Sequence, residues 1–203
     1  SGPSANTSGG PSPTSWQHVQ KDLDSKIDGI ICGAPCSGGI ESTVIDLSGI
    51  YKDKNQDTIF ILRPGLITPE MISSETGFKV EYDPALLKKP VIDEKGNINN
   101  DPNFKPKAPG MKYKHYSPKA DVTLVIGDRD NQKIKELFEE KIKSGQNGIT
   151  IYPDIQSFYA SLRQADDKGL DFIIAVLPKD NSSLAFSLKN RAVKAAGYNI
   201  VYL

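Results

Sequence analysis

The strongest constraint on the fold is the alternation of apolar runs and amphipathic segments from residue 120 to residue 203. The runs "ADVTLVIG", "NGITIYP", "LDFIIAVLP" and "YNIVYL" are typical of strands, and the segments between them are typical of helices. In "DNQKIKELFEEKIKSG" we expect Ile134, Leu137, Phe138 and Ile142 to face inward. Strands that alternate with helices are joined by right-handed crossovers, so this part predicts an α/β domain with a mostly parallel sheet.

Two further helices are predicted upstream by their start signals. Residues 15–25 carry apolar residues at helical spacing, and Thr14 followed by Gln17 matches a capping box. In "LITPEMISSETG", Thr68 stands where an N-cap is expected and Pro69 occupies the first helical position. Helices therefore occur in both halves of the chain.

Three short strands are expected in the same region, at 27–33, 43–47 and in "TIFILRPG". From Asp83 to Met111 five prolines interrupt the pattern and no periodicity survives, which indicates a long linker. We therefore expect three segments, with the bounds 1–88 for a first domain, 89–119 for the linker and 120–203 for a second domain.

Composition narrows the possible functions. Lys and Arg together number 25, as do Asp and Glu, so the chain as a whole has no strongly basic footprint for nucleic acid. No apolar run approaches the roughly 18–20 residues that span a bilayer, and no signal-peptide pattern is present. Two cysteines are too few for a disulfide framework, which favours a reducing cytoplasm. The start at Ser-Gly without Met suggests that the natural N-terminus lies upstream.

The opening segment "PSANTSGGPSP" combines hydroxyl and amide side chains with glycines that let backbone N–H groups turn toward a guest. Such concave N–H arrays bind phosphate or carboxylate oxygens. The segment is neither a Walker A loop nor a GxGxxG loop. A solvated loop explains the same composition, so both interpretations stay open.

Two other short motifs offer polar groups beside strands. "GIESTVID" places Glu41, Ser42 and Thr43 at the mouth of a strand, where hydroxyls meet ligands in sheet crevices. "LRPG" places Arg63 before a turn, and arginine pairs with phosphate through two parallel hydrogen bonds. Strand capping and a plain surface arginine are the alternatives.

The segment "PGMKYKHYSPK" interleaves lysines and a histidine with two tyrosines. Basic and aromatic side chains on a rigid segment suit a nucleotide, by charge on its phosphates and stacking on its base. A linker that packs its tyrosines is the alternative. His18 and His115 make no metal-binding pattern, Cys32 and Cys36 are weak signals for zinc, and no Ser-His-Asp arrangement can be argued.

Taken in order, "PSANTSGGPSPT", "GGIESTVIDL", "ILRPGLIT" and "APGMKYKHYSPKADV" resemble the threonylcarbamoyl-AMP synthases in their long, two-domain form. The tail "LAFSLKNRAVKAAG" is similar to the end of that family's C-terminal domain. The resemblance implies part of a YrdC-like α/β twisted-sheet domain, then a linker, then a small Rossmann-like βαβ domain.

The resemblance also implies a reaction. Members of the family combine L-threonine, bicarbonate or CO2, and ATP with Mg2+, into L-threonylcarbamoyladenylate and pyrophosphate. A separate transferase complex then moves the threonylcarbamoyl group to adenosine 37 of tRNAs that decode ANN codons. The resemblance therefore implies a cytoplasmic nucleotidyltransferase of tRNA modification, with no membrane partner.

The resemblance further implies site residues, none of them a nucleophile, a base or a metal ligand. Those that match the family's threonine-binding positions are Gly2 and Ser42. Those that match the nucleotide side, or the linker that folds over the cavity as a lid, are Ser4, Asn6, Ser12, Arg63, Lys112, Tyr113, Lys114, His115 and Tyr116.

One departure from the family's pattern is the absence of an upstream basic segment and its threonine-binding histidine. We therefore expect the chain to lack the N-terminal half of the YrdC-like domain, which would be a separate chain or missing, and to be inactive alone. A non-catalytic nucleotide-binding or RNA-binding module is the alternative function.

Overall fold

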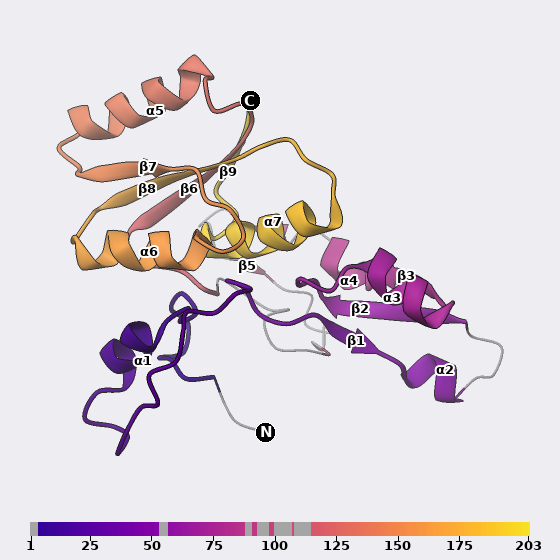
Figure 1. Ribbon diagram of the computed structural model, residues 1–203. Coiled ribbons are helices and arrows are strands. Elements are labelled where there is room, and N and C mark those ends of the chain that lie inside the picture. The colour runs from indigo at the N-terminus through magenta and orange to yellow at the C-terminus, as the bar shows by residue number, and fades with distance from the viewer. Residues whose placement is uncertain (1–3, 53–56, 88–90, 93–97, 100–106, 108–114) are drawn as a thin grey trace. The chain divides into compact units, whose positions relative to one another are not determined.

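The structure is a computed structural model, and the positions of its two parts relative to each other are not determined (Figure 1). The large unit comprises Ser1–Glu41, Lys114–Asn181 and Leu188–Leu203; the small unit comprises Ser42–Tyr113 and Ser182–Ser187. The domain bounds expected from the sequence stay a prediction. The residues that the structure describes are 4–52, 57–87, 91–92, 98–99, 107 and 115–203.

The large unit is built on a four-stranded sheet in the order β7-β8-β6-β9, and all three strand pairs are parallel. This confirms the predicted parallel sheet. Its strands are β6 (Asp121–Ile126), β7 (Gly148–Ile151), β8 (Phe172–Leu177) and β9 (Ile200–Tyr202). In the sequence, β6 is followed by helix α5 (Gln132–Lys143), β7 by α6 (Phe158–Asp167) and β8 by α7 (Ser183–Ala195).

Both faces of this sheet are covered, as Figure 1 shows, with α5 on one side and α6 and α7 on the other. Strand β8 is buried along its whole length, and its side chains alternate between the two cores. Ile174 packs in the core under α5, whereas Ile173 and Ala175 pack in the core under α6 and α7. A strand buried on both faces explains the unbroken apolar run in the sequence.

Three of the four side chains that were predicted to face inward on helix α5 do so. Ile134 is 2% exposed, and Leu137 and Phe138 pack against the same core. Ile142 is the exception, because it lies in the last turn of the helix and is 43% exposed.

The N-terminal part of the large unit contains α1 (Trp16–Leu23), which confirms the predicted helix. The predicted capping box is wrong, because the N-cap is Ser15 and its side chain makes no capping hydrogen bond. Instead, the backbone N–H of Thr14 donates to Nδ1 of His18, 3.1 Å away. A histidine ring thus satisfies a donor at this helix start.

The strand predicted at 27–33 is also wrong. No residue of that run belongs to a strand, and Ile31 is 98% exposed. An apolar run becomes a strand only where a partner supplies backbone hydrogen bonds, and the sequence pattern does not reveal that partner.

The small unit contains a three-stranded sheet in the order β1-β2-β3, with β1 antiparallel and β3 parallel to β2. Its core centres on Ile59, Ile61 and Ile72. Thr68 accepts a hydrogen bond from the N–H of Met71, which confirms the predicted helix start. The elements are β1 (Val44–Asp46), α2 (Ser48–Lys52), β2 (Thr58–Arg63), α3 (Pro69–Thr76), β3 (Lys79–Tyr82), α4 (Pro84–Leu87) and the pair β4 (Val91–Ile92) and β5 (Ile98–Asn99).

Within the described residues, none of the helices has both the length and the apolar character that a membrane crossing requires.

Candidate functional site

In the large unit, one carboxylate joins three distant parts of the chain. Ser12 donates its hydroxyl hydrogen bond to Oε1 of Glu41. Oε2 of the same carboxylate accepts from Nε of Arg191 at 2.7 Å and from the hydroxyl of Tyr159 at 3.1 Å. Arg191 and Tyr159 are fully buried, and the Glu41 side chain is 18% exposed. We call Ser12, Glu41, Tyr159 and Arg191 the carboxylate cluster.

The surroundings of Glu41 favour its ionised form, whereas those of Tyr159 favour its neutral form. Burial alone would raise the pKa of Glu41, but the Arg191 charge and the hydrogen bonds from Ser12 and Arg191 outweigh it, so the pKa lies below its ordinary value. Burial, together with the Glu41 charge, raises the pKa of Tyr159 well above its ordinary value. Tyr159 is therefore a neutral donor at physiological pH, and Glu41 is a carboxylate.

The opening segment of the chain is fixed by a second buried arginine. Arg163 of α6 donates from Nε and Nη2 to the carbonyl oxygen of Pro11, at 3.0 and 2.6 Å. Its Nη1 and Nη2 donate to the two carboxylate oxygens of Asp22, at 2.9 and 2.7 Å. The segment that composition alone left open as a solvated loop is therefore held at Pro11 by a buried side chain.

A hollow of about 390 Å³ opens beside this arginine. Its wall carries both signs of charge, and several of these groups are already engaged with one another: Lys21 with Asp167, and Asp166 with the backbone N–H of Lys119. The lining residues are Thr7, Gly10, Pro11, Lys21, Asp22, Lys26, Ser117, Pro118, Lys119, Arg163, Asp166 and Asp167.

The pair formed by Arg163 and Asp22 predicts a pH dependence of stability. The hydrogen bonds from Arg163 hold the pKa of Asp22 below its ordinary 3.8. The stabilisation is therefore fully present above pH 3.8 and is lost as the pH falls through the folded-state pKa. We expect the thermal midpoint to fall on acidification below about pH 4, and to fall less steeply in Asp22→Asn.

Thermal unfolding followed by circular dichroism from pH 6 to pH 2.5 measures this slope. The matched control is Asp24→Asn, which removes an exposed carboxylate two residues away and should leave the wild-type slope. Equal slopes for wild type and Asp22→Asn would contradict the assignment.

In the small unit, the structure brings together two residues predicted from separate motifs. Arg63, at the end of β2, donates from Nε to the carbonyl oxygen of Ser42 at 3.0 Å and from Nη2 to the Ser42 hydroxyl at 3.1 Å. Thr43 bonds both backbone groups of Ile67, at 2.8 and 3.2 Å. The guanidinium is thus oriented by the chain before any ligand arrives.

His115 and Tyr116 lie in the large unit, and Tyr116 is only 4% exposed. Their ring centroids are 4.1 Å apart, and Tyr116 also lies against Tyr159 at 5.5 Å and beneath the Arg191 guanidinium at 5.9 Å. Tyr116 has a φ of 66°, a backbone conformation that bulky residues rarely adopt. This pair therefore packs beside the carboxylate cluster.

Among the other predicted site residues, exposed Ser4 donates to the side chain of Asn6, and Asn6 donates to the carbonyl of Thr7 at 2.9 Å. Cys32 and Cys36 are free and exposed, and within the described residues no group of three His, Cys, Asp or Glu side chains is placed to hold a metal. The predicted residues outside the described part of the chain are Gly2, Lys112, Tyr113 and Lys114.

Sequence reasoning missed the two buried arginines. Each stands in the apolar stripe of an amphipathic helix: Arg191 follows Leu188 by three residues and precedes Ala195 by four, and Arg163 follows the buried Tyr159 by four. A charge on such a stripe must find a partner, because burying it alone is costly. That signal was present in the sequence, but it does not name the partner.

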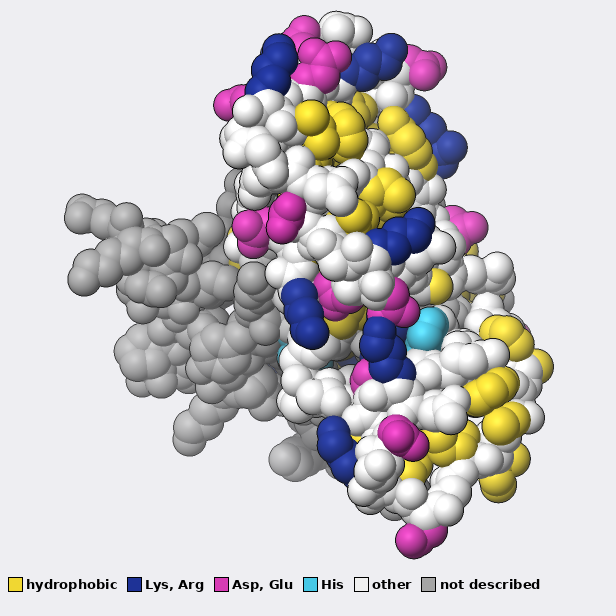
Figure 2. Space-filling view, turned by 90° about the vertical axis from the view of Figure 1, so that its left-hand side faces the viewer, with side chains coloured by type: hydrophobic (Ala, Val, Ile, Leu, Met, Phe, Trp, Pro, Cys, Tyr) yellow, Lys and Arg dark blue, Asp and Glu magenta, His cyan; other side chains and the backbone are white. Residues whose placement is uncertain are grey.

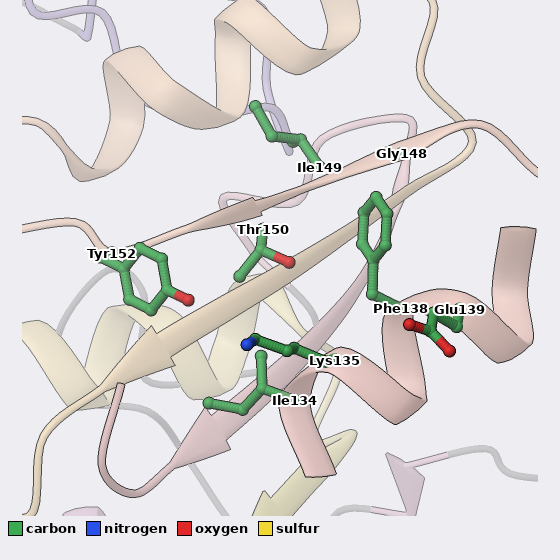
Figure 3. Close-up of a pocket in the computed structure, with 8 residues that line it drawn as sticks. All are labelled: Ile134, Lys135, Phe138, Glu139, Gly148, Ile149, Thr150 and Tyr152. Carbon is green, nitrogen blue, oxygen red and sulfur yellow. The ribbon is translucent and has the colours of Figure 1, made fainter. Parts of the chain in front are cut away.

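A second hollow, of about 310 Å³, lies between α5 and β7 (Figure 3). Ile134 and Phe138 face Thr150 and Tyr152 across it, and Lys135 and Glu139 supply the charges. It includes none of the residues predicted from the motifs.

On the face in Figure 2, basic and acidic side chains are interspersed and do not separate by sign.

The parallel sheet covered by helices defines an α/β protein, and comparison with known sequences identifies its family. Residues 67–197, more than half of the chain, match the family described as "Threonylcarbamoyl-AMP synthase, C-terminal domain", so the chain belongs to that family. Residues 1–65 match the Sua5, YciO and YrdC family, which is described as "Telomere recombination". This is the family of YrdC-like domains. The expectation that the chain lacks the N-terminal half of the YrdC-like domain is not borne out, because this second match covers the whole segment before residue 66.

Curated relatives carry the same name. The chain is 37% identical over 218 residues to the threonylcarbamoyl-AMP synthase of Pyrococcus abyssi, covering 98% of this chain and 58% of the relative. It is 34% identical over 222 residues to that of Bacillus subtilis, covering 98% and 57%. The chain therefore spans somewhat more than half the length of these relatives.

Solved structures agree with the sequence matches. The chain is similar to P. abyssi Sua5 complexed with L-threonine, with a TM-score of 0.77, 34% identity, and coverage of 99% of this chain and 58% of that one. It is equally similar in fold to a P. abyssi Sua5 variant in which a histidine and the following tyrosine are alanine, with a TM-score of 0.77, 32% identity and the same coverage. The predicted fold class is confirmed.

Proposed function

We propose that this chain takes part in the synthesis of L-threonylcarbamoyladenylate from L-threonine, bicarbonate or CO2, and ATP. The observation that carries the proposal is the Arg63–Ser42 pair, which joins two motif residues with complementary chemistry. Similarity to named synthases over 98% of the chain supports it. The proposed class of enzyme is a nucleotidyltransferase.

The chemistry suits positioned charges and hydrogen-bond groups. The amine of threonine takes up CO2 as a carbamate, a carbamate oxygen attacks the α-phosphorus of ATP, and pyrophosphate leaves. Arg63 has five N–H donors, and within the part of the chain that the structure describes two of them bond Ser42; we propose the others for the phosphates. Its positive charge stabilises the negative charge that develops during the displacement.

The assignment of substrates to residues is based on the motifs. Gly2 and Ser42 are proposed to bind threonine, with Ser4, Asn6, Ser12 and Arg63 on the ATP side. Lys112, Tyr113, Lys114, His115 and Tyr116 belong to the proposed lid; since Tyr116 is buried, we assign it to support of the lid. Mg2+ enters with ATP as substrate, the product goes to a tRNA-modifying transferase complex, and the cytoplasm is the proposed location. The bounds 1–88, 89–119 and 120–203 remain our proposed domains.

The test is pyrophosphate release from Mg-ATP that requires both L-threonine and bicarbonate. Arg63→Met should lower kcat/KM for ATP by about 10–100-fold, because charge-assisted bonds to phosphate are lost. The matched control is Lys79→Met, which removes an exposed cation paired with Glu81 in the same unit and should leave the rate unchanged.

Pyrophosphate release that ignores threonine would refute the proposal. ATP binding without any pyrophosphate release would favour the non-catalytic nucleotide-binding module.

A further inference from the structure

The carboxylate cluster connects the opening motif with the two helices that cover one face of the parallel sheet. Ser12 lies in the segment that matches one family, whereas Tyr159 and Arg191 lie in the segment that matches the other. Ser12, Tyr159 and Arg191 each donate a hydrogen bond to the carboxylate of Glu41. One side chain therefore links residues more than 100 positions apart.

Stability alone does not explain this arrangement. A buried ion pair recovers little more than its own desolvation cost, and well-packed apolar side chains of similar volume often serve stability equally well. Arg191 is held further by Oδ1 of Asn190 at 3.2 Å and by the Tyr116 ring. With Arg191 and Tyr159 fully buried, the carboxylate has little freedom to move.

The cluster also fixes the hydroxyl of Ser12. A serine hydroxyl has one hydrogen to donate and two lone pairs that accept. The hydrogen of Ser12 is committed to Glu41, so toward any other group Oγ offers lone pairs only. A ligand group that meets Ser12 must then be a donor, such as a ribose hydroxyl or an amino group, and not a phosphate oxygen.

We propose that Glu41, Tyr159 and Arg191 are positioning residues for this reaction, which act on the nucleotide through the Ser12 hydroxyl. This inference rests on the proposed function. It gives the C-terminal α/β part of the chain a task in the active site beyond carrying a lid. Glu41 orients the hydroxyl, and Arg191 and Tyr159 hold Glu41 in place.

A double-mutant cycle tests the proposal. Glu41→Gln is nearly isosteric, but its amide can donate to Ser12 and release the serine hydrogen; we expect kcat/KM for ATP to fall by about 10-fold or more. In a Ser12→Ala background the same substitution should change kcat/KM by less than about 2-fold, because its route of action is gone. Tyr159→Phe, which keeps the ring, should show the same dependence on Ser12 with a smaller effect.

The matched control is Gly169→Ala, which strains the backbone of the large unit at a φ of 63°, away from the opening segment, and should combine multiplicatively with Ser12→Ala. A general loss of structure would make Glu41→Gln and Tyr159→Phe behave like this control. If the effects of Glu41→Gln and of Tyr159→Phe on kcat/KM each combine multiplicatively with the effect of Ser12→Ala, the proposal is overturned.

Titration with Mg-ATP separates this inference from the proposed function. If no threonine-dependent pyrophosphate release occurs, the proposed function fails, and the same cycle is measured on the dissociation constant for Mg-ATP. Coupling between Glu41 and Ser12 in that constant supports the positioning role, whereas additivity or the absence of nucleotide binding overturns it. If pyrophosphate is released and the effects are multiplicative, only the positioning role fails.

Discussion

Arg163→Met is expected to lower the free energy of unfolding by about 3–5 kcal/mol, the usual cost of removing one partner of a buried ion pair. The side chain is 9% exposed and makes four hydrogen bonds, two to the Pro11 carbonyl and two to Asp22. Methionine fills much of the volume but leaves the carbonyl and the carboxylate without these donors. Unfolding in urea, followed by circular dichroism, measures the change.

The matched control is Lys21→Met. Lys21 also pairs with an aspartate, Asp167, but the two side chains are 56% and 49% exposed. Exposed pairs contribute about 0–1 kcal/mol, so this variant should remain close to wild type. Equal losses for the two variants would show that burial does not decide the cost.

Gly39→Ala is the second large effect, at roughly 2–5 kcal/mol of lost stability, because two costs combine. Gly39 has a φ of 68°, which disfavours any side chain. A Cβ there would also overlap the backbone of Ile155 and Gln156, with the Gln156 carbonyl oxygen only 2.8 Å away. Backbone atoms cannot rotate aside as a flexible side chain does.

Gly169→Ala separates the two costs. Gly169 has a φ of 63° and lies in the same unit, but among the described residues no heavy atom beyond its two chain neighbours stands within 4 Å of its Cβ position. This variant should lose only the conformational part, about 1–2 kcal/mol. A loss in Gly39→Ala no greater than in Gly169→Ala would mean that the segment at Gly39 moves away at little cost.

The sequence predicted the elements of the large unit well because each of its strands and helices repeats one period over several residues. Strand β8 and helix α5 are clear cases, since burial on the sheet and along one helical face is written directly into their apolar spacing. The run at 27–33 failed because its apolar residues show no strand partner, and Ile31 is almost fully exposed.

The candidate site was predictable only in part. Ser12, Ser42 and Arg63 stand in short motifs whose chemistry is visible locally. The partners were not visible, because Glu41 meets Arg191 across 150 positions and Pro11 meets Arg163 across 152. Composition and spacing indicate that a buried arginine needs a partner, but they carry no information about which one it finds.

The 150 positions between Glu41 and Arg191 also set an order of events during synthesis. At roughly 5–20 residues per second, a ribosome adds Arg191 about 8–30 s after Glu41. For that interval Arg191 has not yet been added, so the Glu41 carboxylate lacks its arginine partner and Ser12 has no fixed acceptor from this cluster. A nascent chain that stops before α7 thus has the opening motif complete in sequence but lacks the arginine that locks its carboxylate.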